Sequence, residues 1–198
     1  QGGPDQTQPP PRAFIQMLDC YILEETPEGI RVSDQHALHE RLLYERIKAQ
    51  LGETTVRSQR LLIPELIELS AQDFFRIMDL KDDLGRLGLE IDEFGDRTIV
   101  VRAVPQMFKD FKTREFFDDL LGELAGSPAD SAEEQLDALA RVMACKAAVK
   151  AGQRLSAPQI RELLAMRDRM PGVTTCPHGR PVSFQITDGE LETKFKRR

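Results

Sequence analysis

Histidine, cysteine and carboxylate side chains gather in two short strings of this sequence. The string DQHALHERLLYE contains five of them: Asp34, His36, His39, Glu40 and Glu45. It also holds two of the three histidines in the chain. The third, His178, lies beside Cys176 in CPHGRP. Because these are the side chains that ligate zinc and related metals, their clustering predicts a metal site.

Helical spacing explains how the first string could act as one group. A helix is expected to run to about Gln50, with Ser33 or Asp34 as its N-cap. Residues four apart share a helix face, so His36 and Glu40 can bind the same ion. Asp34 can add a carboxylate from the start of the helix.

The second string and a third cysteine would complete such a site. Cys176 and His178 flank a proline, and this stiff loop could present a thiolate and an imidazole in the same direction. Cys145 could supply a further thiolate from a helix. One hypothesis is that Cys176 and His178 share an ion with Glu40.

Each of these residues also has an ordinary structural explanation. Asp34 is a residue type that caps helices. Glu40 and Glu45 are spaced to pair with neighbouring arginines on the surface. Cys145 lies among alanines and suits a buried position, and His178 suits a turn. Taken together, however, D-x-H-x-x-x-E on a helix and C-P-H in a loop favour a metal site.

Length and composition set the broad class. The 198 residues are 40% hydrophobic, which allows one domain or two small ones, and no long apolar run predicts a membrane span. No signal peptide is visible, and three distant cysteines favour a reducing compartment with free or metal-bound thiols over a disulfide framework. Residues 1–12 are rich in proline and resemble the end of a linker. We therefore expect a C-terminal piece of a longer protein.

The fold is expected to be α+β. Extended stretches are predicted at residues 13–23, 30–32, 61–63, 89–94, 98–104 and 182–186, with a short basic tail after the last. Helices are predicted at 70–87, 113–125, 132–151 and 157–170. Strands at both ends and in a middle hairpin predict a sheet-plus-helices subdomain with a smaller subdomain inserted.

Positive charge is concentrated late in the chain. The net charge is −6, yet residues 141–180 hold eight Lys or Arg against two acids. Such a block could bring a polyanion to the metal site, and a solvated helix face is the ordinary alternative. The candidate DNA-binding residues are Lys146, Lys150, Arg154 and Arg180.

Several strings resemble motifs of one family. DQHALHERLLYE resembles the D-Q-H-A-x-x-E-x-x-x-x-E signature of the nuclease-bearing branch of the MutL mismatch-repair family. ACK at 144–146 resembles its ACR-type motif, CPHGRP its third motif, and FKR at 195–197 its short terminal element. Two positions differ: Lys146 stands where Arg is frequent, and Val182 where Thr is common. Neither change removes a ligand type.

The resemblance implies a C-terminal dimerisation and endonuclease domain that nicks duplex DNA, with zinc or manganese at its site. Asp34 and Glu40 would be catalytic. The implied metal ligands are Asp34, His36, Glu40, Cys145, Cys176 and His178, with Glu45 as a further motif residue and His39 without a role. Implied partners are a second copy of the chain, duplex DNA and, through the full-length protein, a mismatch-recognition protein. ATP would bind only to an N-terminal domain upstream.

The same resemblance predicts how the chain divides. Residues 13–57 and 146–198 would form the dimerisation subdomain, and 58–145 a regulatory subdomain. Gln59-Arg60-Leu61-Leu62-Ile63-Pro64 resembles the Q-x-L-x-x-P peptide that docks on the replication sliding clamp. Leucine side chains would enter an apolar pocket of the clamp while Gln59 makes polar contacts.

Two other functions remain open at this stage. The site could be a structural zinc site in a non-catalytic dimerisation and interaction module. Alternatively, the chain could be a zinc hydrolase of small molecules, which predicts an enclosed apolar pocket at the metal site.

Overall fold

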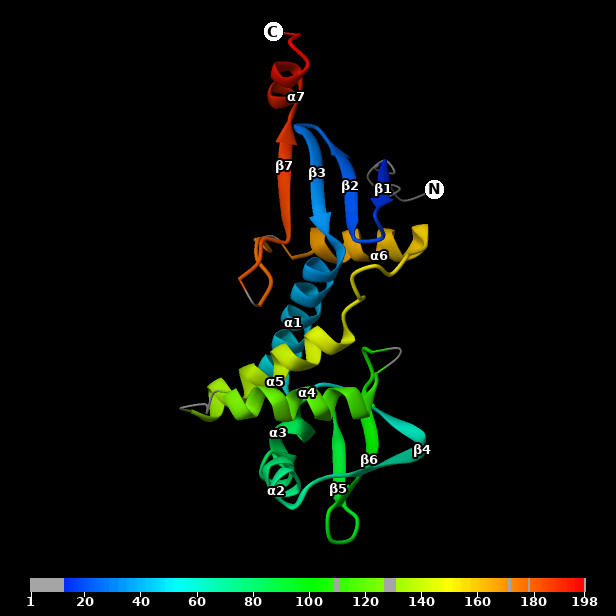
Figure 1. Ribbon diagram of the computed structural model, residues 1–198, viewed down its shortest axis with the longest axis vertical. Helices are drawn as coiled ribbons and strands as arrows, with labels where there is room; N and C mark the ends of the chain where they lie inside the picture. The colour runs from blue at the N-terminus through cyan, green and yellow to red at the C-terminus, as the bar shows by residue number, and fades with distance from the viewer. Residues whose placement is uncertain (1–12, 109–110, 127–130, 171, 178, 198) are drawn as a thin grey trace, which may run out of the picture. The chain divides into compact units, whose positions relative to one another are not determined.

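The computed structural model of the chain describes residues 13–108, 111–126, 131–170, 172–177 and 179–197 (Figure 1). It divides into two compact units. We call the part up to His39 together with the part from Val149 onward the terminal unit, and Glu40–Ala148 the middle unit. No helix in the described part of the chain is long and apolar enough to cross a membrane.

An antiparallel sheet forms the terminal unit. Its strand order is β1-β2-β3-β7, and its strands are β1 (Phe14–Met17), β2 (Tyr21–Thr26), β3 (Gly29–Asp34) and β7 (Ser183–Thr187). The turn between β2 and β3 ends at Gly29, whose φ is +133° and where a Cβ atom would lie 2.2 Å from the Ile186 carbonyl oxygen. Only glycine fits there, so this residue sets the start of β3.

One face of this sheet packs against α6 (Ala157–Asp168). Alternation along β2 turns Ile22 and Glu24 towards that face, and both are almost fully buried. The guanidinium of Arg167, from α6, donates to both Glu24 carboxylate oxygens at 2.6 and 3.0 Å. A buried ion pair therefore ties the helix to the sheet.

The middle unit packs helices on a second antiparallel sheet of order β4-β6-β5. Its elements are β4 (Ser58–Glu68), α2 (Ala71–Asp79), α3 (Lys81–Arg86), β5 (Glu90–Glu93), β6 (Thr98–Pro105), α4 (Thr113–Gly126) and α5 (Ala132–Ala147). Helix α1 (Gln35–Glu53) begins in the terminal unit and continues into the middle unit. Phe116, Phe117 and Ile77 are fully buried in one apolar core with Ile47 of α1.

The predicted α+β class is confirmed, and three predicted elements are wrong in detail. The strand expected at 13–23 is two strands, because Leu18 and Asp19 adopt positive φ and turn the chain. The helix expected at 70–87 is two helices that meet at Leu80. The tail contains α7 (Asp188–Lys194), which begins with a capping box between Thr187 and Glu190.

Candidate metal centre

The first turn of α1 is held by Asp34. This residue ends β3, and its Oδ1 accepts hydrogen bonds from the backbone N–H groups of His36 and Ala37, both at 2.9 Å. Asp34, rather than Ser33, is therefore the N-cap. Its Oδ2 accepts no hydrogen bond from the residues that the structure describes. Capping thus occupies one carboxylate oxygen and leaves the other for a cation.

His36 is held by one ring nitrogen. Its Nδ1 lies 2.8 Å from the carbonyl oxygen of Val149. A carbonyl only accepts, so Nδ1 carries the proton and the neutral ring has its lone pair on Nε2. Ring nitrogens that bind metals usually have this arrangement, with the other nitrogen donating to a carbonyl or carboxylate. In the neutral ring, Nε2 is therefore the nitrogen with an available lone pair.

His39 has the opposite arrangement. The backbone N–H of Val149 donates to its Nδ1 at 3.0 Å. Burial lowers the pKa of this imidazole to about 4, an effect that Glu162 opposes and His36 adds to. The neutral ring therefore carries its proton on Nε2 and has its other lone pair in use. This geometry agrees with giving His39 no role as a ligand.

The two glutamates of the string differ in burial. Glu40 is only 2% exposed, so the expectation that it is a surface partner of an arginine is wrong. A carboxylate buried this deeply is stable only when it is hydrogen-bonded, paired or bound to a metal. Glu45 forms a half-exposed ion pair with Arg41 at 2.6 Å. For Glu45, the ordinary surface explanation is confirmed.

The cysteines are all reduced thiols. Cys145 is half-buried in the last turn of α5, and Cys176 is 3% exposed. The backbone N–H of Cys176 donates to Arg180 O at 2.8 Å, and that of Gly179 to Cys176 O at 2.9 Å. These bonds join the Cys176 backbone to Gly179 and Arg180, and the Cys176 side chain is buried. His178 lies outside the described residues.

The candidate ligands divide between the units. Asp34, His36 and Cys176 belong to the terminal unit, and Glu40 and Cys145 to the middle unit. Within the described part of the chain, which lacks His178, no group of three or more His, Cys, Asp or Glu side chains is arranged to hold a metal. What the structure shows is how backbone groups hold single side chains, most clearly Asp34 and His36 at the start of α1.

A buried glutamine beside these ligands was missed by the sequence reasoning. Gln35 is 0% exposed. Its Nε2 donates to the carbonyl oxygens of Asp19 at 2.7 Å and Gln153 at 2.8 Å, and its Oε1 accepts from Gln16 Nε2 at 2.6 Å. These bonds tie the start of α1 to the β1–β2 turn and to the segment after α5. The signal was present, because Gln35 is the Q of the DQH string.

The basic residues separate into two groups. Lys146 of α5 forms an ion pair with Asp119 of α4, so its charge is already partly compensated. Lys150, Arg154 and Arg180 are exposed. Arg167, from the same stretch, is buried against Glu24. The region is therefore less uniformly cationic than its composition indicates.

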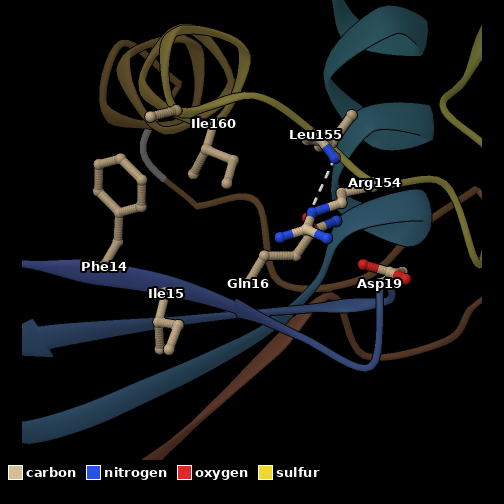
Figure 2. Close-up of a pocket in the computed structure, with 8 residues that line it drawn as sticks. Phe14, Ile15, Gln16, Asp19, Arg154, Leu155 and Ile160 are labelled. Carbon is tan, nitrogen blue, oxygen red and sulfur yellow. Dashed lines mark hydrogen bonds between the residues drawn. The ribbon is translucent and has the colours of Figure 1, made fainter.

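A hollow of about 410 Å³ lies in the terminal unit (Figure 2). Figure 2 shows Phe14 and Ile160 on one side of β1 and Ile15 on the other, with Gln16 accepting a hydrogen bond from the Leu155 backbone at 3.0 Å. None of the candidate metal ligands lines this hollow. It is therefore not the apolar substrate pocket at a metal site that a small-molecule zinc hydrolase requires.

The predicted clamp-binding segment lies in β4, at the edge of its sheet. Gln59 and Arg60 pair with β6, and pairing resumes at Glu65, so the four residues 61–64 stand opposite Arg102 alone. The side chains of Leu62 and Ile63 are 99% and 78% exposed. The segment is thus a bulge that presents apolar side chains to solvent.

These features define a two-unit α+β domain in which Asp34 and His36 each have one polar atom held by the backbone at the start of α1. The sequence model described as the MutL C terminal dimerisation domain matches residues 14–155. The chain belongs to this family.

Relatives named DNA mismatch repair protein MutL extend the match over nearly the whole chain. The protein of Paramagnetospirillum magneticum is 41% identical over 94% of this chain, and that of Phenylobacterium zucineum 36% over 94%. The protein of Rhizobium rhizogenes is 35% identical over 98%. The chain spans only 31%, 30% and 33% of these relatives, respectively. It therefore corresponds to about a third of the length of these relatives.

Proposed function

We propose that this domain is a metal-dependent endonuclease that nicks duplex DNA during mismatch repair. The observation that carries the proposal is the start of α1. Backbone groups hold one polar atom of Asp34 and one of His36, and leave Asp34 Oδ2 and His36 Nε2 for a cation. The two remaining atoms are a hard carboxylate oxygen and an imidazole nitrogen, which are both ligand types for divalent ions.

The residues present fit a divalent ion such as zinc or manganese. Asp34 and Glu40 supply hard oxygen ligands, His36 an imidazole nitrogen, and Cys176, Cys145 and His178 softer ligands that suit zinc. A bound ion would activate a water molecule and stabilise the leaving oxygen of the phosphodiester. The chain itself would orient the ligands and bind the DNA backbone. The exposed Lys150, Arg154 and Arg180 would contact phosphates. Lys146 would contribute less to phosphate binding, because Asp119 already compensates part of its charge.

A nicking assay tests this proposal directly. Supercoiled plasmid is incubated with the purified chain and manganese, with and without the sliding clamp, and conversion to the relaxed form is measured. Conversion that a chelator abolishes supports the nuclease. A chain that binds zinc and dimerises but never nicks, with clamp and manganese present, supports the non-catalytic interaction module instead.

The outer face of the terminal sheet is the surface proposed for homodimerisation. Strand pairing places eight apolar side chains on the face opposite α6. They are Ile15, Met17, Tyr21, Leu23, Ile30, Val32, Phe184 and Ile186. All are half-buried or exposed, and Phe184 is 60% exposed. Because an apolar face of this extent marks an interaction site, and the family is one of dimerisation domains, a second copy is its occupant.

Replacing Phe184 by Asp is expected to convert the dimer to a monomer. A charge buried within an apolar interface loses its hydration without gaining a partner. Light scattering after size-exclusion chromatography should show the mass halved. Phe94→Asp is the matched control, since Phe94 is 57% exposed in the middle unit. Dimers that persist in Phe184→Asp, or that are lost equally in both variants, would contradict this interface.

The bulge in β4 is the surface proposed for the sliding clamp. An exposed extended segment at a sheet edge can enter a groove of the clamp while the rest of the domain stays folded. Gln59 flanks the bulge, and its exposed side chain is available for polar contacts. Leu62 and Pro64 are exposed within it, while Leu61 packs against the core and anchors it.

Joint replacement of Gln59, Leu62 and Pro64 by Ala is expected to abolish clamp binding and clamp-stimulated nicking. Folding should change little, because substitutions at exposed positions usually shift stability by no more than about 0.5 kcal/mol. Surface plasmon resonance against immobilised clamp measures the loss. Leu66→Ala serves as control, since Leu66 is 57% exposed on the same strand but outside the segment. Wild-type affinity in the triple variant would mean that the segment is only a strand.

Other partners belong to the full-length protein. A mismatch-recognition protein would act through it, and an ATPase domain upstream would bind ATP. The proposed place of action is the bacterial cytoplasm, near the nucleoid, where duplex DNA, clamp and reducing conditions are all present.

A further inference from the structure

Val149 contacts both histidines of α1 through its backbone. Its carbonyl oxygen lies 2.8 Å from His36 Nδ1, and its N–H lies 3.0 Å from His39 Nδ1. All three residues belong to the terminal unit. One residue therefore offers an acceptor to one imidazole and a donor to the other.

These two contacts determine where the ring protons lie. The Val149 carbonyl can only accept, so His36 must carry its proton on Nδ1. The Val149 N–H can only donate, so His39 must have a bare Nδ1 and carry its proton on Nε2. In water a neutral imidazole exchanges between these two forms. Here the two rings, three positions apart on one helix, are held in opposite forms.

The segment after Val149 is itself held in place. Gln35 Nε2 donates to Lys150 O at 3.3 Å and to Gln153 O at 2.8 Å. The Gln153 side chain accepts from the Lys150 backbone N–H at 3.2 Å. The Val149 carbonyl that faces His36 therefore directly precedes a backbone turn that is held by Gln35, the first residue of α1.

We propose that the Val149 carbonyl fixes His36 in its Nδ1–H tautomer, an effect that we call the lock. His39 is then a positioning residue that keeps the Val149 backbone in the orientation that the lock requires. His39 anchors the Val149 N–H, which keeps the Val149 carbonyl facing His36 Nδ1. In the neutral ring, His36 Nε2 is then the bare nitrogen, which is the atom that can bind a metal. This inference rests on the proposed metal site for its purpose, but the tautomers exist without metal.

Nitrogen-15 NMR of the metal-free 198-residue chain, labelled at histidine, tests the lock. At pH 8, above the usual range for imidazole, protonated and bare ring nitrogens give separate signals. The expected result is an Nδ1–H form for His36 and an Nε2–H form for His39. An Nε2–H form for His36, or averaged signals for both rings, would overturn the proposal.

Two variants of His39 test its positioning role. His39→Asn keeps an acceptor near the place of Nδ1, whereas His39→Leu removes it. His36 should remain locked in the Asn variant and become averaged in the Leu variant. Zinc affinity, measured by chelator competition, should fall about 10–100-fold in the Leu variant only, the usual effect of losing such a supporting contact.

The outcomes separate this inference from the proposed function. Equal zinc affinity and equal His36 signals in both variants would overturn the role of His39. A chain that binds no zinc or manganese would overturn the metal site, while the metal-free spectrum still decides the tautomers. Thermal melting checks that each variant is folded, and the wild-type spectrum decides the lock even if the Leu variant fails to fold.

Discussion

Asp34→Asn is expected to abolish nicking of supercoiled DNA and to leave the melting temperature unchanged. Asn caps a helix as well as Asp does, so the bonds from the His36 and Ala37 N–H groups to Oδ1 survive. The second oxygen becomes an uncharged amide nitrogen, which cannot ligate a cation. A loss of at least ~100-fold in rate corresponds to about 2.7 kcal/mol of transition-state stabilisation.

Two further variants separate capping from catalysis. Asp34→Ala loses both roles, so it should be inactive and also less stable by about 0.5–2 kcal/mol. Asp96→Asn makes the same charge change at an exposed residue of the β5–β6 turn and should nick like the wild type. A stable Asp34→Asn protein that cuts at the wild-type rate would show that Asp34 is only a cap.

Arg167→Ala is expected to cause the largest loss of stability. Arg167 and Glu24 are 8% and 1% exposed, and two hydrogen bonds join them. Removing the guanidinium takes two hydrogen bonds and a positive charge away from a buried carboxylate, which costs about 3–5 kcal/mol. The melting temperature should fall by roughly 6–20 °C, at 2–4 °C per kcal/mol for a chain of this size. Calorimetry measures the change.

The control variants identify the origin of that loss. Arg161→Ala removes an exposed arginine from the same helix and should shift stability by no more than about 0.5 kcal/mol. The double variant Arg167→Met with Glu24→Leu removes both charges and should recover much of the lost stability. If the double variant is as unstable as Arg167→Ala, packing rather than the lost charge compensation is responsible.

Local pattern was sufficient to predict the class and most elements of the fold. Apolar periodicity located α4, α5 and α6, and the hairpin of β5 and β6 followed from Gly95. The split of the first strand was not predictable in this way. Leu18 and Asp19 adopt positive φ without a glycine to mark the turn. There, bonds from other parts of the chain, such as Gln35 to Asp19 O, favour the turn over local preference.

The candidate site was likewise predictable only in part. The types and spacing of Asp34 and His36 were visible in the sequence, and the structure supplies the backbone contacts that orient them. Ion pairs between residues far apart in the chain could not be predicted from the sequence. Lys146 is compensated by Asp119, and Arg167 by Glu24, so counting charges along residues 141–180 overestimated the positive surface. Which acid neutralises which base depends on packing between elements far apart in sequence.

The bulge in β4 also has a consequence for solubility. A regular edge strand carrying Leu62 and Ile63 would offer an open row of backbone hydrogen-bonding groups beside apolar side chains, which promotes strand-to-strand aggregation. Residues 61–64 instead leave the regular ladder, and Pro64 has no N–H to donate. The interruption that displays the segment thus also prevents it from extending another molecule's sheet. The chain can therefore keep the segment proposed to dock on the clamp exposed with a lower tendency to aggregate.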